Sequence, residues 1–245
     1  MKTTGVIAVS GVRVVGEPTW RDDAAPLLMA LLALMAWDAL GLDLPLARAF
    51  GSAQGFAWRE HWLTSSVMHG GVRNAAWVLF AALVVGIRFP LPMLRTLSRR
   101  ERWWWLGTTL LCIALIPLLK RASWTSCPWS LAEFGGGSAR YVPHWLLGQR
   151  DGGPGGCFPS GHASTAFGFL AGWYVLRRTA PGLARAWLVA TVASGLTLGW
   201  VQMMRGAHYA SHTLWTAWIC WAITMSSYHV FRSWHEGDVA HRDRS

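Results

Sequence analysis

Six apolar runs limit the folds open to this chain more than any other feature of its sequence. They cover about residues 24–42, 72–91, 101–119, 162–177, 185–204 and 209–231. Each run is close to the ~20 residues that an α-helix needs to cross the hydrocarbon core of a bilayer. Only 14% of the 245 residues are charged, against about 25% in a soluble globular domain. The sequence therefore predicts an all-α, polytopic membrane protein with six transmembrane helices.

Arginine residues gather in the connections between these runs and predict the orientation of the chain. Positively charged connections stay in the cytoplasm when a membrane protein is inserted. Three clusters follow the second, fourth and sixth runs: Arg88, Arg95, Arg99, Arg100 and Arg102; Arg177, Arg178 and Arg185; Arg232, Arg242 and Arg244. Arg13 and Arg21, near the start, agree with this side. We therefore expect both termini in the cytoplasm and the segments 43–71, 120–161 and 205–208 on the outer side.

This pattern divides the chain into three parts. Residues 1–23 form a cytoplasmic N-terminal segment, residues 24–231 the six-helix membrane domain, and residues 232–245 a cytoplasmic tail. The first segment lacks the 7–15-residue apolar core of a signal peptide, so we expect no cleavage there. The net charge of +10 does not indicate nucleic-acid binding, because the basic residues flank apolar runs. The segment 56–70 is amphipathic, and we expect it to lie in the membrane interface.

Three groups of polar residues fall on the expected outer side. "KRASWTSCPW" begins at Lys120, "PSGH" covers residues 159–162, and "RGAHYASH" covers residues 205–212. Ionisable groups at membrane depth are costly and usually serve a function. These three groups are therefore the candidate site.

The residues in these groups suit the binding and transfer of a phosphoryl group. Ser160 is a good N-cap for the following helix, and free backbone N–H groups at a helix start attract an anion. Lys120 and Arg205 would neutralise the charge on the phosphoryl oxygens. Two histidines would act as nucleophile and general acid. The combination favours phosphoryl transfer.

The order of these groups resembles the type 2 phosphatidic acid phosphatase family over about residues 100–230. The resemblance implies a six-helix membrane enzyme that removes phosphate from lipids without a metal ion or other cofactor. It makes His162 the general acid and His208 the nucleophile, which forms a phosphohistidine, with His212 as the residue that orients His208. The motif matches and the charge argument together give a phosphate-binding set of four residues: Lys120, Ser160, Gly161 and Arg205.

Three positions depart from the family pattern. Cys127 and Gln202 stand where the family has arginines, and His212 stands where it has an aspartate. Arg205 lies about one helical turn from Gln202 and would reach the same phosphate. An imidazole at position 212 accepts a hydrogen bond from His208 but lacks the carboxylate charge. Asp38 or Asp43, near the outer end of the first run, is a second possible source of that charge.

The chain also resembles a bacterial subgroup with "CPW", "CFP.GHAS" and "RGAHxxSH" motifs. That resemblance implies a multi-pass protein of the bacterial inner membrane with its active site facing the periplasm. Cys127 and Cys157 lie on that outer side, where the periplasm is oxidising, and we expect a disulfide between them. Cys112 and Cys220 lie inside runs, where cysteine packs as a small apolar residue.

The expected partners are the lipid bilayer and a lipid phosphate: a polyprenyl diphosphate, phosphatidic acid, phosphatidylglycerol phosphate or lipid A. Hydrolysis is our first interpretation, and phosphate transfer to a lipid acceptor is the alternative. Three other interpretations stay open: a zinc centre of His162, His208 and His212, a haem- or quinone-handling protein, and a phospholipid-binding protein without turnover. Neither the lipid nor the oligomeric state follows from the sequence.

Overall fold

A computed structural model of the chain describes residues 19–137, 139–146 and 148–242. The expected N-terminal segment, residues 1–23, lies mostly outside this range, and so do Arg13 and Arg244. The expected C-terminal tail does not form a separate element. The last helix of the chain continues through the first part of this expected tail and ends at Arg242.

The fold is all-α, and a helix lies at each of the six apolar runs, as the sequence predicts. The fourth run forms two helices joined by the 3₁₀ turn η5, Gly168–Leu170. The helices are α1 (Trp20–Ala39), α3 (Val72–Arg88), α4 (Arg99–Arg121), α5 (Gly161–Phe167), α6 (Ala171–Thr179), α7 (Pro181–Met204) and α8 (Ala210–Arg242).

Short elements fill the connections between the long helices. After α1 come α2 (Asp43–Arg48) and the strands β1 (Gly51–Ser52) and β2 (Gly55–Phe56). The two strands pair antiparallel, with Gly51 opposite Phe56. The remaining elements are the π-helix η1 (Leu63–Gly71) and the 3₁₀ turns η2 (Pro92–Leu94), η3 (Pro128–Ser130) and η4 (Ala132–Phe134).

The segment 56–70, expected in the membrane interface, has no single regular structure. It starts at the end of β2 and enters η1, which runs directly into α3. Trp62, between these elements, is 65% exposed. Its position relative to a membrane stays a prediction.

Two helices of the described residues, α4 and α7, are long and apolar enough to cross a membrane. The part of α3 from Asn74 to Arg88 is also apolar but is shorter. Local sequence sets where α4 begins, because Ser98 and Glu101 form a capping box that satisfies two free backbone N–H groups. Proline occupies the first position of α7, where its missing N–H costs no hydrogen bond.

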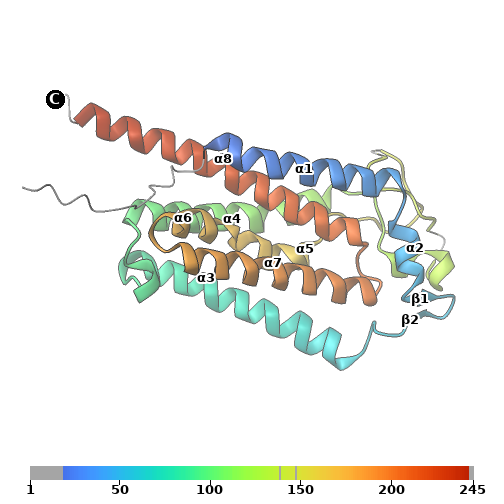
Figure 1. The fold of residues 1–245 in the computed structure, drawn as a ribbon. Helices are drawn as coiled ribbons and strands as arrows, with labels where there is room; N and C mark the ends of the chain where they lie inside the picture. Colours follow the sequence, from blue (N-terminus) through green and yellow to red (C-terminus); the bar gives the residue numbers. More distant parts are fainter. Residues whose placement is uncertain (1–18, 138, 147, 243–245) are drawn as a thin grey trace, which may run out of the picture.

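The long helices lie side by side in a bundle (Figure 1). Helix α1 packs along α8, and α5 and α6 pack against α7. Gly195 of α7 permits the close approach, because a Cβ there would lie 2.4 Å from the Phe167 ring. Helix α2, both strands and the loop between α4 and α5 gather at the end of the bundle away from the C-terminus (Figure 1). This end carries the candidate site.

Candidate active site

Two positions near opposite ends of the loop between α4 and α5 lie next to each other. The sulfur atoms of Cys127 and Cys157 lie 2.08 Å apart, which is disulfide distance, as the sequence predicts. This link connects the segment after Lys120 with the segment before His162. Two motifs that are distant in the sequence therefore start from one fixed loop.

Asp151 anchors the same loop from within. Its carboxylate accepts hydrogen bonds from the Ser126 hydroxyl at 2.8 Å and from the Gly153 backbone at 2.9 Å, as well as from the Ser126 backbone. Asp151 is only 6% exposed. A buried carboxylate with several donors holds its partners firmly, because loss of one would leave a buried charge unsatisfied.

Three histidines from two helix starts meet next to this loop. His162 lies in the first turn of α5, His208 lies in the turn before α8, and His212 lies in the first turn of α8. The ring centroids of His162 and His208 are 5.8 Å apart, and those of His208 and His212 are 5.6 Å apart. His208 and His212 are 1% and 0% exposed. The structure therefore brings the three predicted catalytic residues together.

The contacts of His208 distinguish its two ring nitrogens. Its Nδ1 lies 3.4 Å from Nδ1 of His212 and 3.6 Å from Sγ of Cys157. Because Nδ1 is engaged on both sides, Nε2 is the nitrogen that can attack an electrophile. His212 thus lies next to the His208 nitrogen that the sequence expects it to orient.

The pKa of His208 lies well below its ordinary value. Burial is the largest cause, because the charged imidazolium loses its hydration. Repulsion from the charged forms of His212, Lys120 and His162 lowers this pKa further, and a hydrogen bond to the Cys157 backbone opposes them. His208 is therefore neutral at physiological pH, which is the state that a nucleophile needs.

Ser160 sits at the N-cap position of α5, as predicted, but its side chain makes no capping hydrogen bond. Its backbone N–H instead donates to the His212 carbonyl at 3.1 Å. Its hydroxyl is buried and has no hydrogen-bond partner among the described residues. A buried donor without a partner is costly, so this hydroxyl is available to a ligand beside the histidines.

Gly161 and Lys120 complete the part of the site that the motifs predict. A Cβ added to Gly161 would meet no atom within 4 Å, so there is open space at this turn. Within the described parts of the chain, no carboxylate lies at salt-bridge distance from Lys120. The charge of Lys120 lowers the pKa of His208. A cation and open space beside a neutral histidine suit an anionic ligand.

Arg205 is only partly buried, and its guanidinium contacts other groups of the protein. Its Nε donates to the Arg59 carbonyl at 3.0 Å, and Nη1 lies 3.4 Å from Oε1 of Gln202. Gln202, at the position of the family arginine, is fully buried, and its Nε2 has no hydrogen-bond partner in the described residues. The Gln202 carbonyl also accepts from the His208 backbone at 3.4 Å. The sequence prediction noted Gln202 as a departure but missed it as a donor.

A buried carboxylate from outside the motifs contacts the residue next to His212. Asp43, at the start of α2 and 4% exposed, accepts a hydrogen bond from the Ser211 backbone at 3.0 Å. The Ser211 hydroxyl also donates to Asp43. The Trp37 indole donates to the same carboxylate at 3.0 Å. Asp43 thereby fixes the first turn of α8, which carries His212.

A second carboxylate, Asp38 of α1, reaches this region through a histidine. His144 Nε2 lies 3.3 Å from Oδ2 of Asp38, and both side chains are less than 10% exposed. The Trp215 indole donates to Asp38 at 2.8 Å. The His144 ring stacks on Phe158 and meets His212 edge-on, with centroids 5.7 Å apart. The sequence names Asp38 and Asp43 as alternatives, whereas in the structure both carboxylates lie behind His212.

His144 was missed from the sequence. It lies in the loop between α4 and α5, outside the three motifs. Loop position relative to a helix is set by tertiary contacts, here the stacking on Phe158 and the pair with Asp38. Its one sequence signal is that it is an ionisable residue next to an aromatic one on the expected outer side, which is a weak signal.

Two groups of side chains bring metal-ligating atoms within 4.8 Å of one another among the described residues. The first is Cys157, His208 and His212, and the sulfur of Cys157 is at disulfide distance from Cys127. A disulfide sulfur is not the thiolate that zinc prefers. The group also differs from the zinc centre considered from the sequence, because Cys157 takes the place of His162. The second group is Asp38, Asp43 and His144, whose carboxylates already accept indole and hydroxyl hydrogen bonds.

Comparison with known proteins agrees with this geometry. The model of the PAP2 superfamily matches residues 101–236. The match covers more than half of the chain, and the protein belongs to the PAP2 superfamily. Membership implies phosphatase- or phosphotransferase-type activity on phosphate esters. No curated protein and no solved structure shows significant similarity to the chain.

Proposed function

We propose that the protein removes phosphate from a membrane lipid through a phosphohistidine on His208, without a metal ion. The observation that carries this proposal is the convergence of His162 with the buried His208 and His212. The charge of Lys120 also acts on His208. Superfamily membership supports the reaction class.

The reaction has two steps. Neutral His208 attacks phosphorus through Nε2, so that a phosphorus–nitrogen bond forms as the bond to the lipid oxygen breaks. His162, initially protonated, gives its proton to the leaving oxygen. In the second step His162 takes a proton from water, and the resulting oxygen attacks phosphorus. The phosphorus–nitrogen bond breaks and releases inorganic phosphate and neutral His208.

Four residues would hold and accommodate the phosphoryl oxygens. Lys120 supplies charge, Ser160 and Gln202 supply buried donors that have no partner among the described residues, and Gly161 leaves space for the phosphate. Fixed donors of this kind stabilise the transition state more than the ground state. Arg205 is assigned to the rim, where it would meet the phosphate as it enters.

His212 orients His208, and a carboxylate behind it supplies the negative charge that an imidazole lacks. The pair of Asp38 and His144 contacts His212 through the His144 ring, while Asp43 fixes the helix turn. As His208 gains positive charge in the first step, a buried carboxylate nearby stabilises it. We assign both aspartates to positioning rather than to direct contact with the lipid.

The membrane assignment belongs to the same proposal. The six helical segments would cross the bacterial inner membrane, with residues 24–231 as the membrane domain and both termini cytoplasmic. The arginine clusters support this orientation. Helix α2, both strands and the loop between α4 and α5 gather at one end of the bundle (Figure 1), which would then face the periplasm. The pair of Cys127 and Cys157 at disulfide distance suits that compartment.

The substrate is a lipid phosphate, and the acceptor is water. A polyprenyl diphosphate, phosphatidic acid, phosphatidylglycerol phosphate and a lipid A phosphate all place a phosphate at the membrane surface. Transfer to a lipid hydroxyl would use the same phosphohistidine, and superfamily membership is compatible with it. The two reactions differ only in the group that accepts phosphate.

The test is phosphate release from these four lipids in detergent, with EDTA present throughout. We expect release from at least one lipid, and a loss of at least about 10³-fold in His208→Ala and His162→Ala. His61→Ala, a histidine exposed at the protein surface, is the matched control and should retain full activity. Full turnover by His208→Ala would contradict the nucleophile assignment. Dependence on an added metal ion would favour the zinc interpretation instead.

A further inference from the structure

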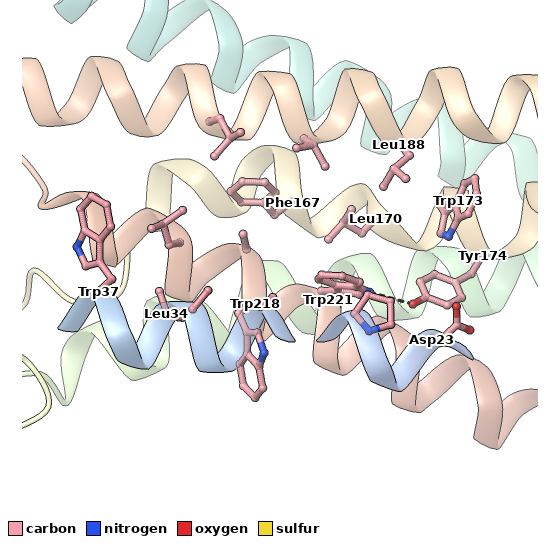
Figure 2. Close-up of a pocket in the computed structure, with 17 residues that line it drawn as sticks. Asp23, Leu34, Trp37, Phe167, Leu170, Trp173, Tyr174, Leu188, Trp218 and Trp221 are labelled. Carbon is pink, nitrogen blue, oxygen red and sulfur yellow. Dashed lines mark hydrogen bonds between the residues drawn. The ribbon is translucent and has the colours of Figure 1, made fainter. Parts of the chain in front are cut away.

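An apolar cavity of about 660 Å³ lies between the helices of the bundle, and none of its lining residues is a histidine. It is lined by residues of α1, α5, α6, α7 and α8 and the η5 turn (Figure 2). Leu34 and Trp37 come from α1, Phe167 and Leu170 from the opposite wall, and Trp218 from α8. The cavity has the volume of a ligand site.

The end of the cavity near the start of α1 is closed by charged groups. Asp23 receives two hydrogen bonds from Arg177, at 2.7 and 2.8 Å, and contacts His229 at 2.9 Å. The Trp221 indole donates to the Tyr174 hydroxyl at 3.0 Å beside them (Figure 2). An apolar ligand gains nothing by extending past buried charges. This end therefore sets a limit on ligand length.

The other end of the cavity approaches the candidate active site. Leu214 follows His212 by two residues on α8, and Phe167 follows His162 by five residues on α5. These offsets are about 3 and 7.5 Å along a helix axis. Trp37, at the same end (Figure 2), donates to Asp43, which binds Ser211. This end of the cavity therefore lies next to the catalytic histidines.

We propose that this cavity holds one hydrocarbon chain of the lipid whose phosphate is cleaved, an inference that rests on the proposed function. The phosphate would lie at His208, and the chain would run along α1 toward Asp23. The distance from Trp37 to Asp23 along α1 is about 21 Å, most of the ~30 Å hydrocarbon core of a bilayer.

The cavity volume indicates one chain rather than two. An engineered cavity of about 150 Å³ holds one six-carbon ring. The cavity here is about four times larger, so it takes roughly two dozen carbon atoms by that measure. That is room for one long chain, and the second chain of a diacyl lipid would lie outside, in the bilayer.

The first test fills the cavity from two walls. Ala30→Trp on α1 and Ala217→Trp on α8 both add bulk to the lining, while Ala25→Trp adds the same bulk to an exposed position of α1. We expect both lining variants to lower kcat/KM for a long-chain lipid phosphate by at least about tenfold, because several CH₂ groups lose their site. Hydrolysis of p-nitrophenyl phosphate, which has no chain, should be unchanged and reports that the variants fold. Wild-type rates on the long-chain lipid in both would overturn the proposal.

The second test measures binding without turnover. Phosphatidic acid with a photoreactive diazirine in one chain is crosslinked to the full-length protein, and the labelled peptides are mapped. We expect labels on the lining stretches of α1 and α8, displaced by unlabelled phosphatidic acid but not by phosphatidylcholine. Equal displacement by phosphatidylcholine would show that the cavity takes any bilayer lipid and would overturn the proposal. Specific labelling with no phosphate release from any ester would leave the chain site intact and refute the proposed function instead.

Discussion

The two halves of the molecule contribute different things to the same site. Residues 101–236 match the superfamily model and carry the three histidines, Lys120 and the predicted disulfide. The preceding residues, from α1 to α3, lie outside the match. They nevertheless supply Asp38 and Asp43 behind His212 and one wall of the apolar cavity.

This comparison locates the charge that the motif half lacks. His212 stands where the family has a carboxylate, and an imidazole cannot replace its charge. The carboxylates come from another part of the chain and reach His212 through His144 and Ser211. The N-terminal half is therefore a part of the catalytic apparatus in this account. The substitutions below measure how much each half contributes to activity and stability.

The largest expected effect lies within the motif half. Replacing both Cys127 and Cys157 by serine should lower the free energy of unfolding by about 2–5 kcal/mol, because the unfolded chain regains the entropy of an open loop. The loop spans 30 residues. Thermal unfolding in detergent, with and without reductant, measures the change. If reductant does not alter the wild-type Tm, the predicted bond is absent from the purified protein.

The next effect tests the contact between the halves. Asp38→Asn keeps the size of the side chain and removes its charge, and we expect kcat to fall by about 10–100-fold, as for partners that orient metal-bound histidines. KM should change little, because the charge acts on the transition state. Glu60→Gln, an exposed acid of the N-terminal half, is the control. A parallel loss of Tm and rise in KM would reduce Asp38 to a structural role.

The pH dependence gives a smaller effect. The lowered pKa of His208 keeps it neutral as pH falls, so the acidic limb of kcat/KM should lie below pH 6.5, the ordinary value. Lys120→Met removes one of the charges that lower this pKa, so the pKa rises and the limb moves up by less than about one pH unit. Lys120→Arg keeps the charge and should leave the limb in place. Movement toward lower pH would contradict the sign.

The smallest effect belongs to a second link between the halves, at the surface. Arg48 of α2 pairs with Glu133 of η4 at 2.5 Å, and both side chains are at least 40% exposed. Exposed pairs contribute about 0–1 kcal/mol. Glu133→Gln should therefore shift stability by less than about 1 kcal/mol and leave kcat unchanged. A large loss of activity would mean that the loop position depends on this pair.

The sequence predicted the helices and the histidines because both are local signals. Each apolar run contains a helix, and the fourth run contains two. His162 lies in the first turn of α5, where the sequence places the start of the fourth run, and His208 lies just before α8. The rest depends on tertiary packing. Ser160 does not cap its helix, since its backbone contacts His212 instead. The position of His144 depends on how a long loop folds back onto α1, and no periodicity reports that.

The cavity could not be predicted from hydropathy for a related reason. An apolar residue that packs against a neighbouring helix and one that lines an internal space give the same signal in a sequence. Leu34 and Leu170 illustrate this, because both are as buried as core residues and yet both line the cavity. The two cases are distinguished only by how the helices pack against one another, and hydropathy does not report this.

The most direct test of the central claim is to trap the covalent intermediate. Protein supplied with a lipid carrying labelled phosphate is quenched at alkaline pH during turnover, and its peptides are mapped. The account predicts labelled phosphate on the peptide that contains His208, and none in His208→Ala. Continued phosphate release with no labelled histidine, or with the label on another residue, would contradict it.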